Sequence, residues 1–387
     1  MHQLIAAPFL GGHFIVKPGG KPGLRLPSAL FNELAGADRC PPELVDPIKT
    51  AFGIDLDQPQ LRDAILVRES SPLPNGGFGR ASWEINLGCN WDCEHCYLAL
   101  KKFEGLLWED KVRLLKTMRD AGVLFLQITG GEPTIDRDFI RAYALAAELG
   151  MMLHISTNAS QLHQPRILEL FDRYPPWRIT ASIYGASEDA YDALVRRRGG
   201  WRLFMRGMAA AIESGLPLRL NIVLTRSNAH ERDAMIGLAE TWGIEHNVYG
   251  NLSPTIYGGA EVLDAQDVAT LTPRSPFTGC NAGHTFFHVD LHGRATVCKV
   301  ERDVKIDLPT EGLPGLARLG AIADRAQVRT GGCSGCAISG SCTVCRPLAK
   351  LYQQAKAPLS SYCTEGRNRY DHSHGGSKHP PSRGRGG

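Results

Sequence analysis

From residue 81 onward the sequence alternates between β-rich runs and helical patterns, and this alternation restricts the possible folds most. Six runs have the composition of β-strands: ASWEINL, LFLQITG, MLHISTN, RITASIY, LRLNIVL and HNVYGNL. Helical patterns lie between most of them, and WEDKVRLLKTMRDAG and DFIRAYALAAELG are the clearest. Alternating strands and helices form parallel sheets with right-handed crossovers. The sequence therefore predicts an α/β fold in which residues 81–260 form a partial or full barrel of six βα units.

Three further regions are expected outside this barrel. Residues 1–75 contain short strands and two helical patterns, which predicts a small α+β domain, and SSPLPNGGFG at 70–79 is typical of a linker. Residues 275–366 are rich in Gly and Cys and show little periodicity, so we expect metal to organise them rather than a hydrophobic core. The low-complexity residues 371–387 predict a disordered tail.

Composition and charge exclude several classes of partner. A net charge of +3 is too small to indicate nucleic-acid binding. The sequence contains no apolar run of about eighteen residues, so it predicts no membrane-spanning helix. The N-terminal apolar run lacks the positive flank of a signal peptide. We therefore expect a cytoplasmic protein, in which the eleven cysteines serve as metal ligands rather than disulfides.

A cysteine motif follows the first strand of the predicted barrel. The segment CNWDCEHC supplies Cys89, Cys93 and Cys96. In parallel barrels the chemistry lies at the carboxyl ends of the strands, where this segment falls. A structural zinc or a fully ligated iron–sulfur cluster takes four protein ligands, so a site with three leaves one position for another molecule. A zinc site or a redox-regulatory cluster is the alternative interpretation.

This motif resembles the signature of the radical S-adenosylmethionine (SAM) superfamily, which implies a partial (β/α)6 radical SAM barrel. In that family three thiolates hold a 4Fe–4S cluster whose fourth iron binds SAM. One electron then cleaves SAM to methionine and a 5′-deoxyadenosyl radical, which abstracts hydrogen from the substrate. The three cysteines would thus be catalytic, and His95 would lie near the adenine.

Polar residues at the ends of the next strands extend the resemblance. TGGEP matches a family motif in which Gly130, Gly131 and Glu132 receive the ammonium group of SAM. By the same likeness, four residues that end the third and fourth strands are placed as SAM contacts, although such residues also cap helices: Ser156, Thr157, Asn158 and Ser182.

The remaining cysteines resemble the SPASM domain, which houses auxiliary 4Fe–4S clusters in radical SAM enzymes that modify peptides. The family connectivity assigns three cysteines to a first auxiliary cluster: Cys280, Cys298 and Cys345. It assigns four to a second: Cys333, Cys336, Cys342 and Cys363. The fourth ligand of the first cluster stays open. The five residues between the two CxxC pairs are too few for a zinc ribbon, and Cys40 is left without a role.

One departure from the family pattern, an arginine run and the N-terminal segment concern the substrate. Many SPASM enzymes carry an acidic residue at the position of Tyr184. The run Arg196–Arg198 is interpreted as a solvated helix face, and contact with the SAM carboxylate or with a peptide is the alternative. Residues 1–75 resemble the winged-helix element that binds leader peptides through an added strand. A barrel cap is the alternative for that segment.

Together these resemblances imply a radical SAM/SPASM maturase that oxidises a ribosomally made precursor peptide, for example by forming a crosslink. Three 4Fe–4S clusters and SAM would be its cofactors, and a flavodoxin- or ferredoxin-type protein its reductant. Alternatives are a maturase of a folded protein, as in sulfatase activation, and a small-molecule dehydrogenase. A non-enzymatic alternative is an iron–sulfur electron carrier or a zinc-organised binding protein, which would not cleave SAM.

Overall fold

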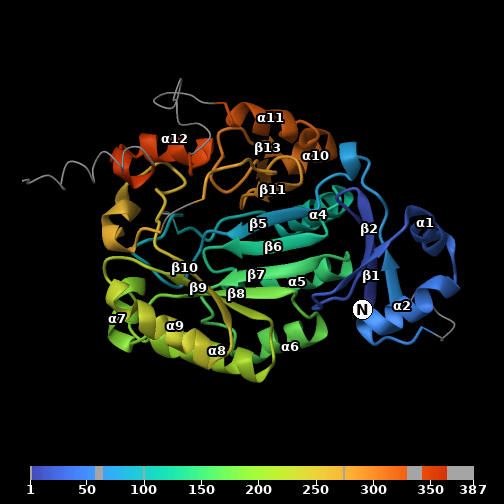
Figure 1. The fold of residues 1–387 in the computed structure, drawn as a ribbon, viewed down its shortest axis with the longest axis horizontal. Coiled ribbons are helices and arrows are strands. Elements are labelled where there is room, and N and C mark those ends of the chain that lie inside the picture. Colours follow the sequence, from blue (N-terminus) through green and yellow to red (C-terminus); the bar gives the residue numbers. More distant parts are fainter. Residues whose placement is uncertain (1, 57–63, 99–100, 273–274, 329–341, 364–387) are drawn as a thin grey trace, which may run out of the picture.

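A nine-stranded, mostly parallel sheet forms the centre of the molecule (Figure 1). The computed structural model describes residues 2–56, 64–98, 101–272, 275–328 and 342–363. The strand order is β10-β9-β8-β7-β6-β5-β11-β12-β13. The six strands of the predicted βα units are all parallel to their neighbours: β5 (Arg80–Asn86), β6 (Phe125–Gly130), β7 (Met152–Thr157), β8 (Arg178–Ile183), β9 (Leu218–Val223) and β10 (Glu245–Tyr249). The sheet stays open, which confirms the predicted α/β fold in its partial-barrel form.

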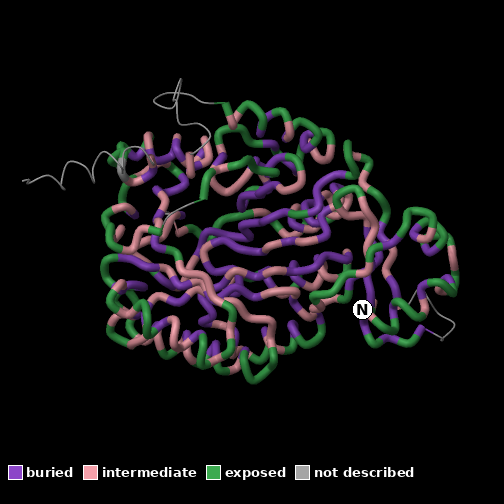
Figure 2. Tube along the Cα trace, in the orientation of Figure 1, coloured by how far each residue is buried: buried purple, intermediate pink, exposed green. Residues whose placement is uncertain are grey.

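Along the barrel strands, side chains that are buried in the core alternate with side chains on the inner face of the curved sheet. In β8, Ile179, Ala181 and Ile183 are fully buried in the main hydrophobic core, whereas the intervening Ser182 lines a cavity. Successive side chains of a strand point to opposite faces, so one face packs on the helices and the other stays polar. Figure 2 shows that the central strands are the most buried part of the chain.

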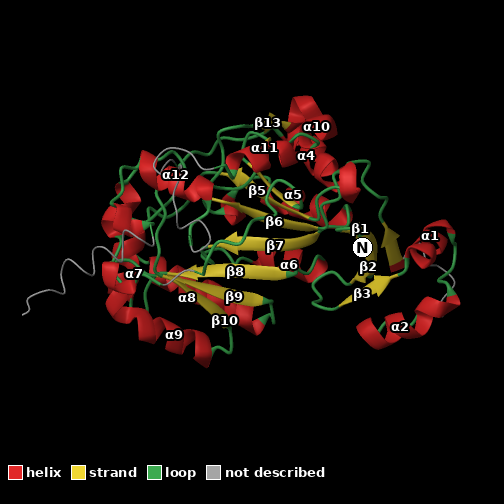
Figure 3. Ribbon diagram, turned by 45° about the horizontal axis from the view of Figure 1, so that its top comes forward, coloured by secondary structure: helices red, strands yellow, loops and turns green. Residues whose placement is uncertain are grey.

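Helices cover the outer face of the parallel strands (Figure 3). They are α4 (Trp108–Asp120), α5 (Phe139–Glu148), α6 (Pro165–Arg173), α7 (Glu188–Val195), α8 (Gly200–Glu213) and α9 (Arg232–Thr241). Short 3₁₀ turns connect other elements: η1 (Pro74–Gly76), η2 (Pro133–Ile135), η3 (Ala229–Glu231), η4 (Glu261–Ala265), η5 (Val268–Thr270) and η7 (Leu359–Ser361). The apolar stripes of the α-helices supply large side chains to the core, such as Phe139 and Tyr143 from α5 and Phe204 from α8.

The N-terminal region forms a separate four-stranded sheet with the order β3-β2-β1-β4. Its elements are β1 (Leu4–Phe9), β2 (Gly12–Val16), β3 (Gly23–Leu26), α1 (Ser28–Gly36), α2 (Pro42–Phe52) and β4 (Ile65–Val67). Ile5 and Val16 pack against Leu124 and Met152, which precede or begin β6 and β7. The small sheet therefore lies at the amino ends of the barrel strands, away from the cysteine motif.

The C-terminal region corrects one expectation. We predicted that metal rather than a hydrophobic core organises residues 275–366, but β11 (Phe286–Val289) pairs in parallel with β5, and Phe287 and Val289 are buried in the main core. The other elements are β12 (Arg294–Thr296), β13 (Ile306–Asp307), α10 (Leu308–Leu316), α11 (Leu319–Ala326) and α12 (Arg346–Gln354). Strands of two to four residues are too short to show periodicity. Cys333, Cys336 and the expected tail at 371–387 lie outside the described residues.

Among the described residues, no helix combines the length and the apolar character that crossing a membrane requires.

Candidate active site at the carboxyl ends of the strands

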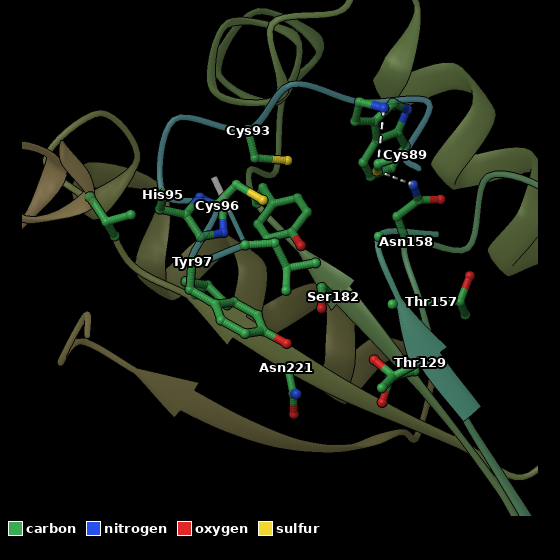
Figure 4. Close-up of a pocket in the computed structure, with 18 of the residues that line it drawn as sticks. Cys89, Cys93, His95, Cys96, Tyr97, Thr129, Thr157, Asn158, Ser182 and Asn221 are labelled. Atoms are coloured by element: carbon green, nitrogen blue, oxygen red, sulfur yellow. Dashed lines mark hydrogen bonds between the residues drawn. The ribbon is translucent and has the colours of Figure 1, made fainter. Parts of the chain in front are cut away.

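A cavity of about 440 Å³ lies where the parallel strands end. Residues that follow β5, β6, β7 and β8 contribute to its wall, together with residues of β9 and the segment 249–253. The predicted site residues that line it are Cys89, Cys93, His95, Cys96, Gly130, Gly131, Ser156, Thr157, Asn158 and Ser182. The fold therefore brings ten positions from four loops and strand ends to one cavity (Figure 4).

The loop that carries the three cysteines is fixed by backbone contacts. Its amides at Asp92 and Glu94 donate to the carbonyls of Val195 and Leu194 at 2.9 and 3.1 Å, which anchors it to the end of α7. The amide of Trp91 donates to the Cys89 sulfur at 3.4 Å. Anchoring at several points holds the thiols in place before any ligand binds.

The three cysteines of the motif line the same cavity (Figure 4). Burial raises the pKa of Cys89 to about 11 and that of Cys93 further; Cys96 also raises the pKa of Cys89, and Cys89 and Cys96 both raise that of Cys93. In the described chain, no three His, Cys, Asp or Glu side chains are close enough to hold one metal ion. A 4Fe–4S cluster binds each thiolate through a different iron atom, and three thiols that face one cavity can supply three such ligands. The three-cysteine donor set fits such a cluster.

An aromatic group flanks the cysteine loop. The rings of His95 and Tyr184 lie 4.8 Å apart, and Trp91 packs edge-on against Tyr184 at 6.2 Å. Burial, aided by Lys101, lowers the pKa of His95 to about 4, so the imidazole is neutral at physiological pH. The Nδ1 atom of His95 is buried and has no hydrogen-bond partner in the described structure. A neutral ring beside a cavity is suited to contact a flat heterocycle.

Gly130 and Gly131 let the second strand end pass close to the first. A Cβ atom on Gly130 would lie 2.2 Å from the Asn86 carbonyl oxygen, and one on Gly131 would lie 2.2 Å from that of Gly88. Gly130 also has a φ of +143°, which favours glycine. Both positions thus require glycine for backbone packing as well as for an open cavity wall.

Glu132 does not line the cavity, although it was expected to receive the SAM ammonium directly. Its side chain is fully buried, and its carboxylate accepts from both the amide and the hydroxyl of Thr134. It also accepts from the Thr157 hydroxyl at 2.7 Å and the Asn158 amide at 2.6 Å. Burial raises the pKa of Glu132, and these hydrogen bonds lower it in part. The carboxylate therefore holds the end of β7 in position behind the cavity wall.

The strand-end polar residues differ in how much they are already bonded. The Ser156 hydroxyl accepts a hydrogen bond from the side-chain amide of Gln127 at 2.6 Å, and the Thr157 hydroxyl donates to Glu132. The side-chain amide nitrogen of Asn158, Nδ2, donates to the side-chain oxygen of Asn90 at 2.8 Å and lies 3.9 Å from the Cys89 sulfur. Asn158 therefore ties the third strand end to the cysteine loop.

Sequence reasoning missed several polar residues of the cavity wall: Gln127, Thr129, Asn221, Tyr249, Asn251 and Lys299. Gln127 and Thr129 sit on β6, and Asn221 on β9, each between buried apolar neighbours. Period-two alternation of polar and apolar residues in LFLQITG and LRLNIVL was the signal that could have found these three. Lys299 carried no such signal because it belongs to a loop after β12.

A buried ionic network joins β5 to the loop that follows Cys298. Arg302 donates two hydrogen bonds to Glu84, at 2.7 and 2.9 Å, and His288 lies 3.4 Å from the same carboxylate. Burial raises the pKa of Glu84, but the hydrogen bonds from Arg302 and His288 outweigh it and hold that pKa well below its usual range. Glu84 is therefore ionised, and it links the first barrel strand to the C-terminal region.

The described C-terminal cysteines fall into two neighbourhoods. Cys280 is close enough to Cys298 to raise its pKa, although burial is the larger cause. Cys342 and Cys363 pack against one small cluster around Val344. Cys345 directly precedes α12, where it is the N-cap. The family connectivity places Cys280 and Cys298 on one cluster and Cys342 and Cys363 on the other; the assignment of Cys345 stays a prediction, and Cys333 and Cys336 lie outside the described residues.

Two other predicted positions lie apart from the cavity. Cys40 packs against the core of the N-terminal domain, and burial raises its pKa to about 11. Residues 196–198 are exposed, but they lie in the turn between α7 and α8 rather than on the expected helix face, and Arg197 donates to the Asn90 carbonyl at 3.0 Å. Arg197 therefore contacts the cysteine loop from outside.

Comparison with known proteins identifies the central domain. Residues 83–239 match the model of the radical SAM superfamily. The chain carries a radical SAM domain. Such domains hold SAM and a 4Fe–4S cluster, which are the groups that the three-cysteine cavity fits.

Two sequence relatives and one solved structure place this domain among known proteins. The PqqA peptide cyclase of Rhizobium meliloti is 32% identical over 40% of this chain and 42% of its own length. An AdoMet-dependent heme synthase of Nitratidesulfovibrio vulgaris is 27% identical over 42% of this chain and 45% of its own. The chain thus matches less than half the length of either relative. Streptococcus suis SuiB, solved with its precursor peptide SuiA, superposes with a TM-score of 0.57 and 16% identity over 88% of this chain and 93% of SuiB.

Proposed function

We propose that this chain is a radical SAM/SPASM maturase that oxidises a ribosomally made precursor peptide. The observation that carries the proposal is the extent of the fold likeness to SuiB, which covers 88% of this chain rather than the radical SAM domain alone. SuiB was solved with a precursor peptide bound, and the PqqA peptide cyclase also acts on a peptide. A crosslink is one outcome that this chemistry allows.

The residues of the cavity have distinct roles in this proposal. Cys89, Cys93 and Cys96 would hold the 4Fe–4S cluster, and the neutral His95 ring would contact the adenine of SAM. Gly130 and Gly131 keep that wall open, while Glu132 fixes Thr157 and Asn158 from behind. When bound, the cluster and SAM supply a 5′-deoxyadenosyl radical that removes one hydrogen atom from the substrate.

The C-terminal cysteines would hold two auxiliary clusters, with Cys280, Cys298 and Cys345 on the first. After the first hydrogen atom is lost, oxidation of the peptide by two electrons leaves one electron and one proton to remove; an auxiliary cluster would accept the electron, and the proton would pass to solvent. The electrostatic effect of Cys280 on Cys298 and the packing of Cys342 and Cys363 against one small cluster support this assignment. A flavodoxin- or ferredoxin-type protein would supply the electron for SAM cleavage.

The N-terminal sheet would bind the leader segment of the peptide along a sheet edge. β3 is an edge strand of that sheet, and an added strand gains main-chain hydrogen bonds there. Because the small sheet packs at the amino ends of the barrel strands, the segment to be modified must extend past the sheet to reach the cysteines.

The test uses the holoenzyme with SAM, a reductant and the precursor peptide encoded beside its gene. Mass spectrometry should show the loss of two hydrogen atoms from the peptide. The Cys93→Ala variant should leave the peptide unchanged, whereas Cys40→Ala, which removes a cysteine outside the cavity, should retain the modification. Modification by the Cys93→Ala variant would overturn the proposal.

A small molecule is the second candidate substrate, because a heme synthase matches this chain over a similar length. Conversion of a small metabolite by the holoenzyme, with no change in any peptide, would favour it.

A further inference from the structure

The side-chain amide of Asn158 is hydrogen-bonded at both of its ends. Asn158 follows β7 and is 6% exposed. Its Oδ1 atom accepts from the backbone amide of Ser160 at 3.0 Å, and its Nδ2 atom donates to Oδ1 of Asn90 at 2.8 Å. Nδ2 of Asn90 in turn donates to the Ser160 hydroxyl at 2.8 Å. Because a backbone amide can only donate, the Ser160 amide determines which end of Asn158 is the oxygen. The nitrogen therefore faces the cysteine loop.

One hydrogen of Asn158 Nδ2 remains after the bond to Asn90, since a side-chain amide nitrogen carries two. Nδ2 lies 3.9 Å from the Cys89 sulfur (Figure 4). The same sulfur accepts from the backbone amide of Trp91 at 3.4 Å. Among the described residues, no side chain donates a hydrogen bond to the other two cysteines of the motif. Cys89 is therefore the motif cysteine whose sulfur has a side-chain N–H donor beside it as well as a backbone one.

The N–H group beside Cys89 favours the state in which the sulfur carries more negative charge. A hydrogen bond to an ionised acceptor is shorter and stronger than one to a neutral acceptor. When a 4Fe–4S cluster takes up an electron, part of the added charge lies on its cysteine sulfurs, and donors to those sulfurs raise the reduction potential. Ser160 and Asn90 hold the Asn158 amide in place. The donor therefore needs no reorganisation when the electron arrives.

We propose that Asn158 is a positioning residue that acts through Cys89: its Nδ2 atom donates to the Cys89 sulfur and raises the reduction potential of the cluster on the three-cysteine motif. This inference rests on the proposed function and adds how electron uptake at that site is controlled. One electron passes from the flavodoxin- or ferredoxin-type reductant to the cluster, and no bond forms or breaks in that step. A higher potential lets a weaker reductant supply the electron. This role differs from the SAM contact expected for Asn158, because both ends of its amide are already engaged.

The experiment is a redox titration of the anaerobic holoenzyme without SAM, followed by electron paramagnetic resonance. The Cys93→Ala protein lacks the cluster on the motif, and its signal is subtracted as that of the auxiliary clusters. Asn158→Leu has a side chain of similar size without an N–H donor. Its equilibrium constant for one-electron reduction should fall at least threefold, which is a potential about 28 mV more negative at about 59 mV per tenfold.

The sign of the shift separates loss of the donor from damage to the site. Added water around a cluster stabilises its more negative reduced state, so a site that merely opens should titrate at a more positive potential. Ser160→Ala is the matched control, because it removes the hydroxyl that accepts from Asn90 but keeps the backbone amide that orients Asn158. It should titrate as the wild type does. A potential that is unchanged or more positive in Asn158→Leu, or an equal negative shift in Ser160→Ala, would overturn the inference.

The inference and the proposed function fail in different ways. Each titrated sample is also reduced with dithionite, given SAM and assayed for 5′-deoxyadenosine. If the wild type forms 5′-deoxyadenosine while Asn158→Leu leaves the potential unchanged, the proposed function stands and the inference alone is overturned. A wild type whose signal equals that of Cys93→Ala has no cluster on the motif, and that result overturns both.

Discussion

Removing one partner of the pair between Glu84 and Arg302 should destabilise the protein more than removing one partner of an exposed ion pair. The Glu84 side chain is fully buried and that of Arg302 is 12% exposed, and two hydrogen bonds join them. Replacing Arg302 with Met leaves a buried carboxylate without its cation. Breaking a buried pair in this way costs about 3–5 kcal/mol.

The expected effect on thermal stability follows from that cost. A domain of 150–250 residues loses about 2–4 °C in melting temperature for each kcal/mol, which predicts a decrease of roughly 6–20 °C for Arg302→Met. The assay is far-UV circular dichroism on the reconstituted protein without oxygen. Iron content should also fall, because the loop after Cys298 loses its attachment to β5.

Two comparison variants make this prediction specific. Glu245→Gln breaks a pair with Arg219 in which the Glu245 side chain is 67% exposed, and it should cost less than about 1 kcal/mol. The double variant Glu84→Met with Arg302→Met removes both charges and should be more stable than Arg302→Met alone. If Arg302→Met melts no lower than Glu245→Gln, the reasoning about the buried pair is refuted.

Three other predictions follow from single contacts. Gly131→Ala places a Cβ 2.2 Å from the Gly88 carbonyl oxygen, and it should weaken SAM binding at least tenfold as measured by equilibrium dialysis. Gly237→Ala, at a position with open space around it, should leave SAM binding unchanged, and equal affinities of the two variants would contradict the prediction. Burial, with Arg178, lowers the pKa of His154 to about 4, so between pH 6.5 and pH 4 the unfolded chain binds a proton that the folded protein does not. The free energy of unfolding should therefore keep its full value above pH 6.5 and decline by up to about 1.4 kcal/mol per pH unit toward pH 4. Melting temperature measured against pH should fall less steeply below pH 6.5 for His154→Gln than for the wild type, and an equal slope would disprove the role of His154. A precursor peptide should need at least about six residues between leader and modified site, because a strand such as β6 spans roughly 20 Å, and efficient modification with a shorter spacer would argue against leader binding at β3.

The sequence predicted those features that depend on local pattern. The six βα units and the cysteine loop were found because each strand and motif is continuous in the chain. Ten of the predicted positions meet at one cavity because parallel strands place their carboxyl ends at one edge.

Features that depend on distant pairing could not be predicted. Ser82 on β5 contacts His288 on β11 across 206 positions, and the short β11 gave no periodic signal. Lys299 reaches the cavity only because of that pairing. Glu132 was expected to face SAM, but whether its carboxylate turns inward depends on donors at Thr157 and Asn158, which the local motif does not contain.

The most direct test of the account is SAM cleavage by the reconstituted protein. Protein prepared without oxygen is reduced with dithionite and given SAM, and 5′-deoxyadenosine is measured with iron and sulfide. We predict 5′-deoxyadenosine with iron near twelve per chain, from about four per cluster, and no 5′-deoxyadenosine from Cys93→Ala, which should keep the auxiliary iron. Zinc in place of iron with no 5′-deoxyadenosine, or cleavage that persists in Cys93→Ala, would contradict the assignment of the three-cysteine cavity.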